Sequence, residues 1–136
     1  MLQAIPASRL PHEWETIGPA LSRAIELDPK RDAMHVLEQG LAGELQFWRV
    51  GGPARGFMVT QVCREETFRK ALWVIYAQGM GGSLTDKREL MALIEDEARK
   101  ARCSAVRFEG RNWRKVFPDY SAVQSADGRW NFRKGI

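Results

Sequence analysis

Residues 75–103 read "IYAQGMGGSLTDKRELMALIEDEARKARC", and the periodicity of this stretch changes within a few positions. Branched and aromatic residues lead into a glycine-rich turn and are typical of a strand. The segment after the turn predicts an amphipathic helix over about residues 84–102, because its apolar residues recur at helical spacing. These residues are Leu90, Met91, Ile94, Ala98 and Ala101. A glycine-rich turn at a helix N-terminus presents unpaired backbone N–H groups, which suit a phosphate.

The first residues of this helix favour a second interpretation. "SLTD" matches a capping box, with Ser83 as the N-cap and Asp86 three residues later, and such a helix satisfies its own first N–H groups. The Asp86 carboxylate also brings a negative charge to the place where a phosphate would bind. The turn is therefore either a phosphate site or a plain connection between a strand and a helix.

The composition indicates a single folded domain over residues 1–136. With 44% hydrophobic residues, a chain of 136 residues can bury one core. No run of about 18 apolar residues predicts a transmembrane helix. The N-terminal segment has no basic stretch followed by an apolar one, so no signal peptide is expected and a cytoplasmic location is predicted. Cys63 and Cys103 lie far apart without metal-ligand spacing, so we expect free thiols and no metal site.

Charge is distributed unevenly along the chain. Residues 1–98 hold 11 basic and 14 acidic residues, whereas residues 99–136 hold 10 basic and 3 acidic residues. The C-terminal third therefore carries a net charge of +7, which favours a phosphate, a nucleic acid or another anionic surface as its partner. A solvated basic face is the alternative.

Periodicity and turn residues predict the remaining elements. Expected helices cover the spaced apolar residues from Leu10 to Ile25, residues 33–40 after the N-cap Asp32, and a short segment at 112–117. Pro19 should split or kink the first of these helices. Expected strands lie at residues 2–7, 44–50, 56–65, 68–78, 103–110, 120–124 and 130–135.

This succession resembles the GNAT superfamily of acyl-CoA-dependent N-acetyltransferases over nearly the whole chain. The resemblance implies an α+β fold with one mixed, mostly antiparallel sheet of about six to seven strands and helices on both faces. In that family, a Gln/Arg-x-x-Gly-x-Gly/Ala turn after the fourth strand binds the diphosphate of coenzyme A. The resemblance thus implies an acetyl-CoA site at Gln78, Gly79, Met80, Gly81, Gly82 and Ser83.

A narrower resemblance lies in residues 103–120, "CSAVRFEGRNWRKVFPDY". This segment is similar to one in GNAT-like proteins of tailed phages, prophages and gene transfer agents. The matching residues are Cys103, Arg107, Glu109, Gly110, Arg111, Trp113, Asp119 and Tyr120. The likeness implies a bacterial context, with phage structural proteins as possible partners.

Acetyl transfer needs a base for the amine and an acid for the leaving thiolate. Glu109 ends a predicted strand beside the expected cleft and is the candidate base; an ion pair with Arg107 or Arg111 is the alternative. The tyrosine that usually serves as the acid in the superfamily aligns with Phe117, which cannot donate a proton. Tyr120 replaces it only if the preceding helix ends differently.

Three hypotheses follow. The first is an acyl-CoA-dependent N-acetyltransferase-like protein of phage or prophage type. The second is a catalytically inactive GNAT-like fold that has lost acetyl-CoA and acts as a virion or protein-binding component. The third is a nucleic-acid-binding module, because Trp113 and Trp130 lie among arginines that suit base stacking. Arginine stems packed on the two indoles explain the same pattern without nucleic acid.

Overall fold

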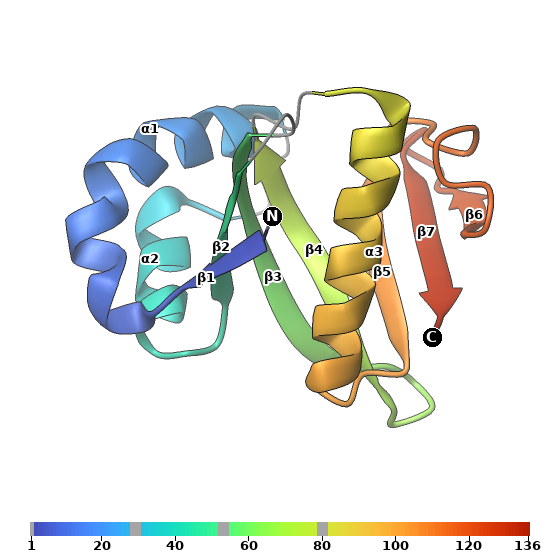
Figure 1. Cartoon of the computed structure of the whole chain (residues 1–136), viewed down its shortest axis with the longest axis horizontal. Coiled ribbons are helices and arrows are strands. Elements are labelled where there is room, and N and C mark those ends of the chain that lie inside the picture. The colour runs from blue at the N-terminus through green and yellow to red at the C-terminus, as the bar shows by residue number, and fades with distance from the viewer. Residues whose placement is uncertain (1, 28–30, 52–54, 79–81) are drawn as a thin grey trace.

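The computed structural model describes residues 2–27, 31–51, 55–78 and 82–136, and it confirms the predicted α+β class (Figure 1). The strands are β1 Leu2–Ile5, β2 Gln46–Val50, β3 Gly56–Arg64, β4 Lys70–Gln78, β5 Ala105–Gly110, β6 Ser121–Gln124 and β7 Trp130–Gly135. The helices are the 3-10 turn Ala7–Arg9, α1 Leu10–Leu27, α2 Ala33–Leu41 and α3 Leu84–Lys100. No helix within these described ranges is long and apolar enough to cross a membrane.

One seven-stranded sheet has the order β1-β2-β3-β4-β5-β7-β6. Five of its strand pairs are antiparallel, and only β4 and β5 run parallel. That parallel pair follows from the connection, because α3 carries the chain from the end of β4 back to the start of β5. The mixed, mostly antiparallel sheet predicted from the sequence is confirmed.

Helices cover both faces of the sheet, and neighbouring residues of one strand show how. Met58 and Val59 on β3 are both buried, but they point to opposite faces. Met58 packs in the core that includes Leu90 and Ile94 of α3, whereas Val59 packs in the core beneath α1 and α2. Figure 1 shows α3 crossing in front of the sheet and α1 and α2 lying together at the left.

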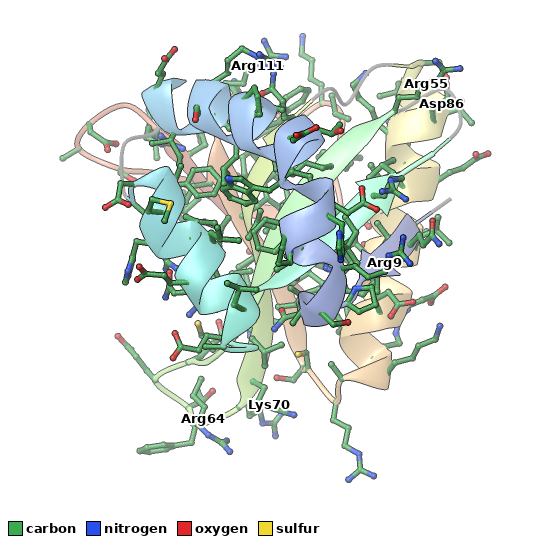
Figure 2. All side chains as sticks on the ribbon, turned by 90° about the vertical axis from the view of Figure 1, so that its left-hand side faces the viewer. Arg9, Arg55, Arg64, Lys70, Asp86 and Arg111 are labelled. Carbon is green, nitrogen blue, oxygen red and sulfur yellow. The ribbon has the colours of Figure 1, made fainter. Side chains whose placement is uncertain are left out.

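Pro19 does not split the first helix, but the helix bends strongly between its two ends, in keeping with the predicted kink (Figures 1 and 2). Pro19 lies inside α1, which runs without interruption from Leu10 to Leu27. Pro19 is exposed, whereas Ile17 and Leu21 are buried in the core, so the ring lies on the solvent side of the helix. A missing N–H and a displaced carbonyl are tolerated on that side, because water can bind the freed carbonyl.

The predicted helix at residues 112–117 is wrong. The chain makes only one hydrogen-bonded turn there, in which the N–H groups of Val116 and Phe117 both donate to the carbonyl of Trp113, at 3.0 and 2.9 Å. Pro118 follows at once and prevents a second helical turn; a separate turn follows, in which the Tyr120 N–H donates to the Phe117 carbonyl at 3.1 Å. This segment, residues 111–119, packs its aromatic residues on β5 and α3 and forms one wall of the site described next.

Candidate functional site: a cleft between two parallel strands

A cleft opens where the parallel strands β4 and β5 separate. The two strands pair only as far as Val74 and Phe108, although β4 continues to Gln78 and β5 to Gly110. On its other edge, β4 pairs with β3 in a register that skips Ile75 and leaves it as the extra residue of a β-bulge. A bulge bends its strand and increases the local twist, which separates the end of β4 from β5.

The cleft has a volume of about 860 Å³, within the range of small-molecule sites. Apolar side chains from α3, β5 and the 111–119 segment form much of its wall: Leu90, Met91, Ile94, Phe108, Trp113 and Phe117. Charged side chains also line it: Lys87, Glu109, Arg111, Asp127 and Arg129. The cleft therefore suits a ligand with a long apolar part and an anionic part.

The start of α3 forms the predicted capping box. The backbone N–H of Ser83 donates to the Asp86 carboxylate at 2.7 Å, and the Asp86 N–H donates to the Ser83 hydroxyl at 3.1 Å. Gly82 has a φ of +92°, and a Cβ atom there would lie 2.8 Å from Asp86 Oδ2. This glycine is needed both for its backbone conformation and for the close approach of the carboxylate.

Asp86 also sets the electrostatics of this turn. Hydrogen bonds from the backbone N–H and then the hydroxyl of Ser83 hold the pKa of the Asp86 carboxyl below its usual value, so it is ionised at neutral pH. Lys87 donates from Nζ to the carbonyl of Gly82 at 2.9 Å. An anionic ligand would therefore meet one carboxylate and one ammonium at the helix start.

The structure describes half of the predicted phosphate turn. Gln78 lines the cleft at the end of β4, and Gly82 and Ser83 lead into α3. Gly79, Met80 and Gly81 lie outside the described residues.

Glu109, the predicted base, lines the cleft near the end of β5. Arg107 and Arg111 were expected as its alternative partners. Arg107 donates to Glu65 at 3.0 Å and stacks on Trp73, with its guanidinium carbon 4.3 Å from the ring centroid. Arg111 lies over the ring of Trp113 at 4.3 Å.

The Glu-Gly-Arg-x-Trp motif at residues 109–113 has a structural explanation. A Cβ atom at Gly110 would lie 3.3 Å from Nε1 of Trp113, so the glycine leaves room for the indole against the end of β5. Stacking on the same indole fixes the guanidinium of Arg111 at the cleft wall. The second tryptophan named in the nucleic-acid hypothesis, Trp130, is likewise covered by Arg114 at 4.1 Å. Both indoles already stack on arginines of their own chain.

Tyr120, the candidate acid, is buried behind the cleft wall. Its hydroxyl donates to the Glu95 carboxylate at 2.9 Å, and Lys134 bridges Glu95 and Asp119 at 2.9 and 2.7 Å. Tyr120 is not among the cleft-lining residues, whereas Phe117, whose ring centroid lies 6.0 Å from that of Tyr120, is. The structure therefore does not bring Glu109 and Tyr120 to one place.

The surroundings of Tyr120 strongly favour its protonated form. Burial, followed by the negative charge of Glu95 and the hydrogen bond to it, raises the pKa of the Tyr120 hydroxyl far above its usual value. Lys134 keeps the pKa of the Asp119 carboxyl below its usual value by a direct hydrogen bond. The Tyr120, Glu95, Lys134 and Asp119 side chains together attach the 111–119 segment to α3 and β7.

Sequence reasoning did not place the hairpin between β6 and β7 at this site. Asp127 and Gly128 fall between the strands predicted at 120–124 and 130–135, and they line the cleft together with Arg129. The single signal in the sequence was the Asp-Gly turn itself, which says nothing about which distant strands the turn approaches. Figure 2 places Arg111 at the upper end of the molecule, the same end as Asp86 at the start of α3.

Comparisons with known proteins were made by sequence and by structure. No protein-family model and no curated protein sequence matches this chain. Aminoglycoside 6'-acetyltransferase type Ii is similar in structure, with a TM-score of 0.68 at 9% identity over 99% of this chain and 96% of the other.

Two further solved structures are similar over the whole length of this chain. A GNAT-family acetyltransferase from Listeria monocytogenes has a TM-score of 0.61 at 11% identity and is covered over 94% of its length. A ribosomal-protein-alanine N-acetyltransferase from Brucella melitensis has a TM-score of 0.61 at 13% identity and is covered over 99% of its length. At these identities the likeness shows the fold. The chain has the fold of the GNAT acetyltransferases.

Proposed function

We propose that this chain is an acyl-CoA-dependent N-acyltransferase that binds its thioester donor in the cleft between β4 and β5. The cleft itself is the observation that supports this function. Its walls are apolar along α3 and β5, as the acyl and pantetheine arm requires, and its charged residues suit the polar parts of two substrates. The structurally similar proteins are acetyltransferases of the same fold, which supports the same class of reaction.

In this proposal the diphosphate of the donor lies at the start of α3. The residues assigned to it are those of the predicted turn: Gln78, Gly79, Met80, Gly81, Gly82 and Ser83. Because Asp86 already accepts the Ser83 N–H, we assign the phosphate contacts to the other N–H groups of the turn and to Lys87. An ammonium has three donor hydrogens, so Lys87 can bind a phosphate while it donates to Gly82.

Glu109 is the proposed general base. The acceptor amine attacks the thioester carbonyl carbon, the Glu109 carboxylate takes a proton from the amine nitrogen, and the C–S bond breaks to release the coenzyme A thiolate. The thiolate takes its proton from solvent. We do not assign the acid role to Tyr120, because it is buried behind the cleft wall and its hydroxyl donates to Glu95.

Titration calorimetry with acetyl-CoA and with coenzyme A tests the proposal. Ala77 is exposed and lines the cleft, so Ala77→Trp fills the site without disturbing the core and should abolish the binding heat. Val123→Trp on the exposed edge strand β6 is the matched control and should bind as the wild type does. If the wild-type chain gives no heat of binding with acetyl-CoA or coenzyme A, acyl-CoA binding in this cleft is contradicted. It is also contradicted if Ala77→Trp binds either ligand as tightly as the wild type does.

A second candidate function is a catalytically inactive GNAT fold that serves as a protein-binding or virion component of phage, prophage or gene-transfer-agent type. Two observations favour it. The Asp86 carboxylate accepts a hydrogen bond from the Ser83 N–H at the start of α3, where a phosphate would bind. Phe117 lines the cleft with a ring that cannot donate a proton. This function predicts no coenzyme A release with any amine and the presence of the chain in purified particles by mass spectrometry. Absence from particles would exclude the virion role.

A further inference from the structure

Two turns meet at the end of the molecule remote from the cleft. These are the β3–β4 hairpin at residues 64–70 and the α3–β5 turn at residues 99–104, here called the hairpin end. The Lys70 ammonium donates to the carbonyl of Ala101 at 2.8 Å, and the Ser104 N–H donates to the carbonyl of Lys70 at 2.8 Å. Both turns lie at the lower end in Figure 1.

Figure 2 shows the separation from the cleft. Arg64 and Lys70 lie at the lower end, whereas Arg111 and Asp86 lie at the upper end. No residue of the hairpin end lines the cleft. This surface is therefore distinct from the site of the proposed function, and the inference does not depend on that function.

The hairpin end holds two unusual backbone conformations. Phe68 and Arg102, with φ of +63° and +60°, are the only non-glycine residues with positive φ in the described part of the chain. Phe68 is the last residue of the turn that its N–H closes by donating to the carbonyl of Glu65. In hairpin loops of this kind, glycine usually holds that last position. Arg102 follows α3 in a Schellman motif. Its N–H donates to the carbonyl of Arg99, and the N–H of Cys103 donates to the carbonyl of Ala98. Glycine is also usual at the position of Arg102 in this motif.

Neither side chain is buried in the core, so no core packing offsets the cost of these backbone conformations. The Phe68 side chain is 79% exposed, and Arg102 is also exposed. Glycine at either position would relieve the backbone conformation without leaving a cavity. Strained backbone conformations cluster at active sites and ligand-binding sites, which makes the hairpin end a candidate contact surface.

Three exposed arginines share the hairpin end with Phe68: Arg64, Arg69 and Arg102. Arg64 donates to the carbonyl of Phe68 at 2.7 Å, and within the described ranges no carboxylate pairs with Arg64, Arg69 or Arg102. Glu65 forms ion pairs with Arg107 on β5 and Arg133 on β7. Among the described residues, Glu66 is therefore the acidic residue of the turn that does not pair with the sheet. The hairpin end is thus a positively charged surface that carries one exposed aromatic ring.

We propose that the hairpin end binds to an anionic lipid surface. The Phe68 ring would lie at the boundary of the headgroups, and Arg64, Arg69 and Arg102 would contact the anionic headgroups. One exposed ring among arginines suits a lipid headgroup layer, whereas a single-stranded nucleic acid needs a basic groove with successive stacking rings. With the cleft at the opposite end, a bound molecule keeps its cleft open to solvent.

Co-sedimentation with vesicles tests this proposal. The full chain should bind vesicles of phosphatidylcholine with phosphatidylserine, bind phosphatidylcholine alone at least about tenfold more weakly, and lose binding as salt rises. Phe68→Gly and Arg102→Gly should each lower binding several-fold and at the same time raise the melting temperature. A structural role for either side chain would lower the melting temperature instead.

Two variants remote from the hairpin end serve as controls. Met34→Ala removes an apolar side chain that is 60% exposed on α2, and Arg23→Ala removes an exposed cation on α1. Both should bind vesicles as the wild type does. Equal binding by Phe68→Gly and the wild type, or equal binding to both vesicle types, would overturn the proposal. So would tighter binding to a single-stranded oligonucleotide that is lost in the same variants.

Discussion

The Oδ2 atom of Asp86 lies 2.7 Å from the backbone nitrogen of Ser83 and 2.9 Å from its hydroxyl oxygen. This carboxylate therefore occupies part of the positive N-terminus of α3, which in the proposed function receives a phosphate. The cleft beside it remains open, with a volume of about 860 Å³. The donor site is thus shaped for a thioester arm but carries one charge that opposes a diphosphate.

Asp86→Asn tests the effect of that charge. The amide keeps an acceptor for the Ser83 N–H but removes the negative charge, so the affinity for acetyl-CoA should rise roughly tenfold by calorimetry. Glu89→Gln removes an exposed carboxylate from the same helix and is the control. An affinity that falls in Asp86→Asn would mean that the carboxylate helps to form the donor site.

Glu109→Gln should slow transfer without weakening donor binding. Losing a general base lowers kcat by about 10²-fold or more, whereas the calorimetric Kd for acetyl-CoA should change by less than about twofold. Coenzyme A release, followed with a thiol reagent, gives the rate. Glu66→Gln, in the exposed β3–β4 turn, should leave the rate unchanged. A rate unaffected by Glu109→Gln would remove this residue from the chemistry.

Tyr120→Phe should destabilise the fold by about 1–3 kcal/mol, because it leaves a buried Glu95 oxygen without its donor. Urea unfolding measures the loss. Adding Glu95→Gln should make the double variant less unstable than the sum of the two single changes, since the two side chains share one bond. Additive losses would mean that this hydrogen bond carries no coupling energy.

Glu65 should make stability depend on pH in the acid range. The hydrogen bond from Arg133, and then that from Arg107, holds the pKa of the Glu65 carboxyl below its usual value in the folded chain. The stabilisation is therefore complete above the unfolded-state pKa and is lost as pH falls through the folded-state pKa. The difference in unfolding free energy between wild type and Glu65→Gln should be largest near neutral pH and shrink below about pH 4. A constant difference would contradict this assignment.

Two helical glycines should respond in opposite ways to alanine. A Cβ atom at Gly40 would lie 2.6 Å from the Phe47 ring and 2.8 Å from Leu10 Cδ1, so Gly40→Ala should destabilise the fold by about 1–3 kcal/mol. At Gly18 the nearest atom is Trp14 Nε1 at 3.1 Å, on a half-buried side chain that can shift. Gly18→Ala should therefore be neutral or stabilising by up to about 1 kcal/mol. Thermal unfolding of both variants checks the contrast.

Local patterns in the sequence were enough for the order of the elements. The helical spacing of Leu90, Met91 and Ile94 predicted α3, and "SLTD" predicted the capping box that the structure contains. Both signals depend on contacts within a few residues, so they can be read along the chain. Residues 112–117 show the limit, because Pro118 follows too soon for a second helical turn to form.

The cleft was decided by the tertiary structure. A bulge at Ile75 separates β4 from β5, and the chain returns 50 residues later to line the opening with Asp127 and Arg129. The environment of Tyr120 likewise depends on Glu95 and Lys134, which approach from α3 and β7. Residue spacing determines which side chains share one face of a helix or strand. Which side chains of different elements come into contact depends on how distant elements pack. In this chain, that packing placed Glu109 in the cleft and Tyr120 behind its wall.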